Sequence, residues 1–132
     1  MSDPSNPTGR ELEIMQVLWD RGPSTVREVV EVLNEARNEP FAYTTILRFF
    51  QIMFEKGLVV RDESNRTHVY SPAAPAQQTK RQMVSDLVKR VFAGSPRELV
   101  LHLLGDEKPT KEALDEIRDA LSELEDQSQT KS

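Results

Sequence analysis

A run of polar side chains recurs at helical spacing near the middle of this 132-residue chain. Winding residues 42–57 at about 100° per residue places these side chains on one side of a helix and apolar ones on the other. Hydroxyl, guanidinium and amide groups are suited to hydrogen bonds with base edges and phosphates in a major groove. We therefore interpret the stretch as a recognition helix whose DNA-reading side carries Thr44, Thr45, Arg48 and Gln51.

The other side of this helix must hold it to a hydrophobic core. Gly57 ends the stretch, and glycine favours the left-handed position just past a helix end. Trp19 and the phenylalanines are better explained as core than as a cofactor-binding set. The residues expected on the buried side are Ile46, Leu47, Phe50, Met53 and Phe54.

Two further helices are expected earlier in the chain, because capping boxes begin at Thr8 and at Thr25. Gly22-Pro23 and residues 38–40 supply the breaks that end these helices. Three helices in this order are the arrangement that a helix-turn-helix needs. Their inward stripes comprise Leu12, Ile14, Met15, Leu18 and Trp19 in the first helix and Val26, Val29, Val30 and Leu33 in the second.

After residue 57 the apolar period changes from 3.6 to about 2, the period of a β-strand. Residues 58–62 and 67–71 are predicted to be strands, and residues 63–66 the turn between them. A hairpin directly after a recognition helix is a wing, which can contact a phosphate backbone or a minor groove. The alternative is a solvated hairpin without a ligand. The candidate contact residues of the wing are Arg61, Asn65, Arg66, Thr67 and His68.

The prolines near residues 73–76 predict a linker, since no periodicity is visible there. It separates an expected DNA-binding domain at residues 1–72 from a helical domain at residues 77–125. Residues 126–132 are expected to be a flexible tail. The predicted fold is mainly α with a small β-hairpin, a winged helix-turn-helix followed by a three-helix C-terminal dimerisation domain.

Three helical patterns occupy the helical domain, with Ser95 and Thr110 as caps of the second and third. The second is apolar on nearly all sides at residues 99–104. Short helices of this kind cannot bury their own apolar surface, so a second copy of the chain is the simplest cover. Folding back on the N-terminal half is the alternative. The residues expected at a homodimer interface are Leu87, Val91, Leu99, Leu101 and Leu103, with a coiled-coil seam of Leu114, Ile117, Leu121 and Leu124.

The composition disfavours several other classes of protein. Hydrophobic residues make up 37% of the chain and charged residues 30%, so a core can form. No apolar run approaches the roughly 20 residues that span a bilayer, and no signal-peptide pattern opens the chain. The absence of cysteine fits a cytoplasmic setting. His68 and His102 fall in different expected domains, and no cluster of His, Cys, Asp or Glu has the spacing of metal ligands. No glycine-rich phosphate-binding loop is visible either. We therefore expect no metal, no cofactor and no enzyme activity.

The net charge of −5 is unusual for a protein that binds DNA. Residues 1–72 alone carry 8 basic and 11 acidic side chains. Contact with DNA must then come from a local cluster of positive charge, and non-specific binding should be weak. The main alternative is a winged helix that docks on another protein without operator binding.

A series of sequence blocks resembles the penicillinase and methicillin-resistance repressor family. The likeness covers about residues 8–124, and the ordered series is far more specific than any one block. It implies a bacterial transcriptional repressor with a winged-helix domain, a helical dimerisation domain and an operator of two-fold symmetry. The blocks are TGRELEIMQVLW at 8–19, GPSTVREV at 22–29, AYTTIL at 42–47, EKGLV at 55–59, RTHVYSP at 66–72, FAGS at 92–95 and LVLHL at 99–103.

The resemblance also implies which residues of the central helix contact DNA. The positions that match the family's contacts are Thr44, Thr45 and Arg48. Ile52 stands where family members usually carry a basic residue, and it could instead contact a thymine methyl group. The basic side chains outside this helix that could compensate are those of the wing with Arg10, Arg21 and Arg27.

Induction in this family typically involves a membrane-bound metallopeptidase sensor that answers a cell-wall signal. The repressor is then cut within its dimerisation helices. The matching segment here is residues 101–104, with Leu-His-Leu-Leu in place of the Asn-Phe bond cut in the best-known members. A sensor of this kind is therefore a candidate partner, beside duplex DNA and a second copy of the chain.

Overall fold

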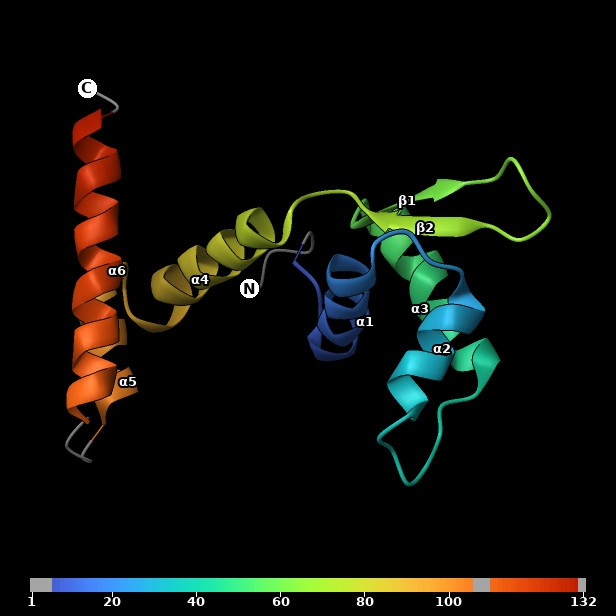
Figure 1. The fold of residues 1–132 in the computed structure, drawn as a ribbon, viewed down its shortest axis with the longest axis horizontal. Helices are drawn as coiled ribbons and strands as arrows, with labels where there is room; N and C mark the ends of the chain where they lie inside the picture. Colours follow the sequence, from blue (N-terminus) through green and yellow to red (C-terminus); the bar gives the residue numbers. More distant parts are fainter. Residues whose placement is uncertain (1–5, 106–109, 131–132) are drawn as a thin grey trace. The chain divides into compact units, whose positions relative to one another are not determined.

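The computed structural model describes residues 6–105 and 110–130, with side chains described up to residue 123 (Figure 1). The chain divides into two compact units between Ala93 and Gly94. The first unit holds α1 (Gly9–Arg21), α2 (Val26–Asn34), α3 (Tyr43–Lys56), β1 (Val59–Asp62), β2 (Val69–Pro72) and α4 (Ala76–Val91), and the second holds α5 (Pro96–Leu104) and α6 (Lys111–Thr130).

The helix ends of the first unit follow the capping signals in the sequence. The backbone N–H groups of Thr8 and Thr25 each donate to a carboxylate three residues later, over 2.9 Å in both cases. At the far end of α3, Gly57 adopts the left-handed conformation with φ of 81°. The predicted starts of α1 and α2 and the predicted end of α3 are therefore confirmed.

The core of the first unit lies where the three helices meet the hairpin. The rings of Phe50 and Tyr70 lie 4.5 Å apart at its centre, with their planes inclined by 42°. Phe54 differs from the expectation of burial, since 38% of its surface is exposed. It lies at the edge of the apolar arc of α3. The buried core residues are Ile14, Met15, Leu18, Val26, Val29, Ile46, Phe50, Met53, Leu58, Val59 and Tyr70.

The hairpin consists of β1 and β2 paired antiparallel, from Val59 opposite Pro72 to Asp62 opposite Val69. The loop between the strands covers residues 63–68, two residues more than predicted, so Thr67 and His68 precede β2. Tyr70 also exchanges backbone hydrogen bonds of 2.8 and 3.0 Å with Ser24, which joins the segment between α1 and α2 to the sheet. Three helices and a hairpin in this arrangement form a winged helix-turn-helix.

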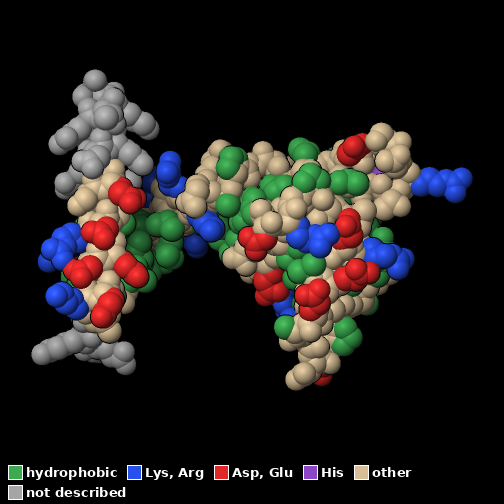
Figure 2. Space-filling model, viewed as in Figure 1, with side chains coloured by type: hydrophobic (Ala, Val, Ile, Leu, Met, Phe, Trp, Pro, Cys, Tyr) green, Lys and Arg blue, Asp and Glu red, His purple; other side chains and the backbone are tan. Residues whose placement is uncertain are grey.

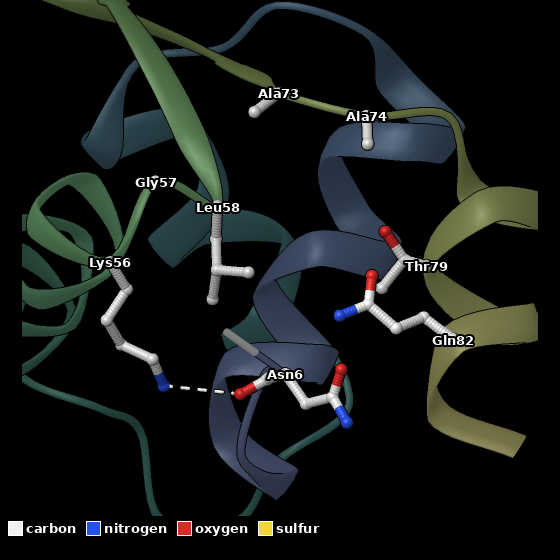
Figure 3. A pocket seen from close by; sticks show the side chains of 8 residues that line it. All are labelled: Asn6, Lys56, Gly57, Leu58, Ala73, Ala74, Thr79 and Gln82. Atoms are coloured by element: carbon white, nitrogen blue, oxygen red, sulfur yellow. Dashed lines mark hydrogen bonds between the residues drawn. The ribbon is translucent and has the colours of Figure 1, made fainter. Parts of the chain in front are cut away.

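The segment between β2 and α4 is held to the body of the first unit. The backbone N–H of Ala73 donates to the carbonyl of Leu58 over 3.0 Å, and the indole N–H of Trp19 donates to the carbonyl of Ala74 over 3.1 Å. Thr79 of α4 is buried, and Figure 3 shows it beside a pocket at the foot of α3. Of the expected linker at residues 73–76, residues 73–75 connect β2 to α4, which begins at Ala76, and hydrogen bonds hold the backbone of Ala73 and Ala74.

The second unit buries none of its described side chains, at residues 94–105 and 110–123. Ser95 and Thr110 cap α5 and α6 as expected, accepting from backbone N–H groups three residues later over 3.3 and 3.1 Å. The α6 helix continues to Thr130, beyond the tail expected from residue 126, because no glycine or proline interrupts it. Throughout the described residues, no helix is long and apolar enough to cross a membrane.

Candidate nucleic-acid interface

The side of α3 turned away from the core presents polar groups to solvent. All four predicted reading residues, Thr44, Thr45, Arg48 and Gln51, are exposed, and the buried Ile46, Phe50 and Met53 hold the opposite side. Arg48 forms no ion pair with any described residue, so its guanidinium is available to an external partner. The helix thus combines a fixed apolar side with an accessible polar one.

A shallow, mainly apolar hollow lies on this accessible side. It is lined by Thr45, Arg48, Phe49 and Ile52, which follow one another at the spacing that aligns side chains along a helix. Phe49 and Ile52 are both half-buried, and Phe49 packs partly against the core. The accessible side of α3 therefore includes apolar side chains next to the guanidinium of Arg48, and we call these four residues the α3 hollow.

The loop of the hairpin lies beside the beginning of α3. A second hollow is lined by Arg66, Thr67 and His68 of the loop and by Tyr43 and Leu47 of α3, together with Val26 and Tyr70. Asn65, the remaining loop candidate, is exposed. The structure thus brings three of the five wing candidates, Arg66, Thr67 and His68, beside the first half of α3.

The fifth wing candidate, Arg61, is engaged inside the first unit. It shares a strand face with buried Val59, because alternate residues of a strand point the same way. Its guanidinium lies 4.0 Å from the centre of the Phe54 ring and donates to Glu63 over 2.6 Å. Hydrogen bonding to Tyr70 and the charge of Glu63 raise the pKa of Arg61. It is therefore placed to stabilise the wing rather than to extend from it.

Lys56, the second cation of α3, forms a partly buried ion pair. Its ammonium donates to Glu11 over 2.7 Å. It also donates to the carbonyl of Asn6 over 3.3 Å, the bond drawn in Figure 3. Burial acts to raise the pKa of Glu11, but hydrogen bonds from Lys56 and Thr8 outweigh this effect and lower it. The pair joins the first turn of α1 to the last turn of α3. Arg48 is left as the cation of α3 that an external ligand can reach.

Of the three basic residues outside the wing that could compensate for Ile52, two form ion pairs and one does not. Arg10 is paired with Glu13 over 3.1 Å and Arg21 with Glu28 over 2.8 Å. Arg27 forms no ion pair in the described part of the chain, and its guanidinium lies 5.9 Å from the ring centre of Tyr43. Among these three, Arg27 is thus the candidate that lies next to α3 with its charge uncompensated.

Charges of both signs alternate over the visible face of the first unit, without a broad basic patch (Figure 2). The positive groups near α3 that have no ion pair among the described residues include those of Arg27, Arg37, Arg48 and Arg66. Within the described residues, no group of three or more His, Cys, Asp or Glu could hold a metal ion. The surface offers a few local cations, which suits selective contact more than general attraction to a polyanion.

The place of Tyr43 beside Arg27 and the wing was not predicted from the sequence. This side chain is 45% exposed, lies next to Arg27 and lines the hollow shared with the wing. The signal in the sequence was an aromatic residue at the start of the expected helix, outside its apolar stripe. The pairing of Glu11 with Lys56 was also missed, because these residues lie 45 positions apart and neither belongs to an apolar pattern.

The fold defines a winged helix-turn-helix protein, and the polar side of its third helix is accessible. A model of the penicillinase repressor family matches residues 7–123, and the chain belongs to this family. The transcriptional regulator BlaI of Mycobacterium tuberculosis is 33% identical over 117 residues, which cover 87% of this chain and 82% of that protein.

The chain is also similar to two further proteins of known role or structure. The methicillin resistance regulatory protein MecI of Staphylococcus aureus is 20% identical over 112 residues, covering 85% of this chain and 89% of that protein. The solved DNA-binding domain of the repressor BlaI is 24% identical with a TM-score of 0.48, covering 58% of this chain and 90% of that domain. The family assignment depends on the family model and the mycobacterial relative.

Proposed function

We propose that the protein is a transcriptional repressor that binds an operator of two-fold symmetry as a homodimer. The observation that supports this most is the accessible polar side of α3, with Thr44 and Arg48 exposed opposite a buried apolar side. Membership of the penicillinase repressor family supports the same function. The proposal places the protein in the cytoplasm, where bacterial DNA lies.

In this proposal α3 enters the major groove and the wing follows the adjacent backbone. Arg48 is suited to a bidentate contact with a guanine, and Thr44, Thr45 and Gln51 supply further hydrogen-bonding groups. Asn65, Arg66 and Thr67 are exposed on the wing, where contacts to phosphate set the position of the protein without reading the sequence. His68 is half-buried and lines the hollow between the wing and α3.

The second unit supplies the proposed dimer contact. Leu103 is 76% exposed and Leu121 is 55% exposed, although both are large apolar side chains. Leu87 and Val91 of α4 are also exposed, at 36% and 60%. A second copy of the chain would remove such surfaces from water, and each fully buried side chain would contribute about 1.5–3 kcal/mol. Leu124 of the expected seam lies outside the described side chains.

Docking on a protein partner, without an operator, is the second candidate function. It is favoured by the net charge of −5 and by the capture of Lys56 in an internal ion pair. Salt dependence separates the two functions. If the protein binds an operator, the logarithm of its affinity should fall linearly with the logarithm of the salt concentration. The slope is set by the number of phosphates contacted. Failure of the full-length protein to retain any duplex from fragmented genomic DNA would contradict the proposal.

We also propose that a membrane-bound metallopeptidase sensor is a partner of this protein, as the family resemblance implies. The matching segment at residues 101–104 lies in α5, and Leu101, His102 and Leu103 are exposed there. Cleavage in this helix would separate the first unit from most of the proposed dimer contact. Mass spectrometry of the repressor from cells treated with a cell-wall antibiotic tests this, and an intact chain in induced cells would contradict it.

A further inference from the structure

The α3 hollow has a chemical character that the hydrogen-bonding residues around it lack. Thr45, Arg48, Phe49 and Ile52 follow the spacing i, i+3, i+4 and i+7, so they form one continuous stripe along the helix. The stripe lies beside Thr44 and Gln51, which are exposed on the same side of α3. Whatever meets the reading residues therefore also meets the hollow.

The walls of the hollow are fixed and apolar. Phe49 packs partly against the core, which holds the orientation of its ring. Ile52 is half-buried and β-branched, so its side chain has little rotamer freedom in a helix. Arg48 and Thr45 bring the polar atoms at the edge. A small apolar group, presented beside hydrogen-bonding groups, fits this combination.

We propose that the α3 hollow receives the 5-methyl group of a thymine in the major groove of the operator. Thymine is the one base that presents a methyl group there, next to a carbonyl oxygen that can accept a hydrogen bond. The guanidinium of Arg48 is placed to bind the guanine of a neighbouring base pair. The inference rests on the proposed DNA-binding function and assigns to Ile52 and Phe49 the recognition of one base in each half-site.

The inference is tested by removing that methyl group from the DNA. Duplexes that bind the full-length protein are first selected from a randomised pool. Each thymine of the selected half-site is then replaced in turn by deoxyuridine, which differs only by the methyl group, and binding is measured by fluorescence anisotropy. We expect one position at which the replacement weakens binding about fourfold per half-site, the effect of burying one methyl group.

The variant Ile52→Ala shows whether the hollow is responsible. It should bind the thymine and deoxyuridine duplexes with nearly equal affinity, and its thermal unfolding should remain close to that of the parent because Ile52 is outside the core. Arg66→Ala serves as the matched control: it should weaken both duplexes while the thymine preference remains. The wild-type comparison of the two duplexes needs no variant and does not depend on how Ile52→Ala folds.

Two other results would overturn the inference. If a selected duplex binds but no thymine methyl matters, or if the preference survives in Ile52→Ala, the hollow does not read thymine, while the proposed repressor function stands. An apolar side chain of a protein partner would then be the better occupant. If no duplex is selected at all, the proposed function itself fails, and the thymine contact fails with it.

Discussion

Arg48 is the side chain that we expect to contribute most to reading of a DNA sequence. It is exposed at the middle of α3 and has no ion pair within the described residues, whereas Lys56 of the same helix is bound to Glu11. We predict that Arg48→Ala lowers affinity for the selected operator by about 1–3 kcal/mol and relaxes specificity at one base position. Anisotropy titrations with the operator and its single-base variants measure both effects.

Arg81→Ala is the control for this substitution. Arg81 is exposed on α4 and forms no ion pair in the described part of the chain, so the variant removes the same charge from another helix. Its affinity should change little. Equal losses in the two variants would mean that Arg48 acts through net charge alone and does not read a base.

Arg66 belongs to the wing and is expected to act differently. It is exposed in the loop before β2, where a contact to phosphate carries no sequence information. We predict that Arg66→Ala weakens operator and unrelated duplexes to a similar degree and reduces the salt slope by about 1. Titrations at several salt concentrations measure the slope. An unchanged slope would remove Arg66 from the set of phosphate contacts.

At the scale of the elements, the ion pair of Glu11 and Lys56 joins α1 to α3. The side chain of Glu11 is 3% exposed and that of Lys56 is 24% exposed. We predict that Glu11→Gln lowers the free energy of unfolding at neutral pH by about 1–3 kcal/mol, because it leaves the ammonium without a charged partner. Urea unfolding measures this. Glu13→Gln, which affects an exposed pair with Arg10, should cost less than about 1 kcal/mol.

The pH dependence of this pair has a definite sign. The pKa of Glu11 is lower in the folded protein than its usual value, so the folded state favours the ionised carboxylate. The stabilisation is therefore fully present above the unfolded pKa of about 4.3 and is lost as the pH falls through the lowered folded pKa. The difference in stability between wild type and Glu11→Gln should shrink below about pH 4. A constant difference would contradict the assigned ionisation.

The elements that could be predicted from the sequence are those with local signals. Capping residues give the starts of α1 and α2, and Gly57 gives the end of α3. The exposure of Thr44 and Arg48 also follows from helical periodicity alone. These features depend on residues within a few positions of one another, so a single sequence contains enough information.

Features that depend on packing between elements were not predicted. The contact of Arg61 with the ring of Phe54 joins β1 to α3, and a positive charge in a strand gives no sign of an aromatic partner on another element. The connection at residues 73–75 reads as a flexible linker, but Trp19, 55 residues away, binds its backbone. Such contacts are set by tertiary packing, which periodicity does not contain.

At the scale of the whole molecule, α5 and α6 leave large apolar side chains in contact with water. We predict that Leu121→Asp, which places a charge in the expected α6 seam, yields a monomer whose first unit still folds but whose operator binding is greatly weakened. Multi-angle light scattering measures the mass and circular dichroism the fold. Ser122→Asp adds the same charge beside the seam and should remain dimeric. A dimer of Leu121→Asp would contradict the assigned interface.

The division of the molecule into a DNA-binding domain and a dimerisation domain stays a prediction. The compact units of the structure bear on where the boundary between these domains lies. The first compact unit continues through α4 to Ala93, although the sequence predicted that the reading domain would end at residue 72. Leu87 and Val91 of α4 are exposed. We therefore propose that α4 is part of the first compact unit and also contributes to the dimer contact. This would link the spacing of the two reading helices to the dimer interface.

Selection of duplexes from a fully randomised pool by the full-length protein tests the central claim most directly, because the claim is that the accessible side of α3 reads base pairs. We predict enrichment of an inverted repeat whose half-sites share a guanine, and loss of selection at that position with Arg48→Ala. A pool that stays random with wild-type protein at low salt would show that this surface does not read DNA.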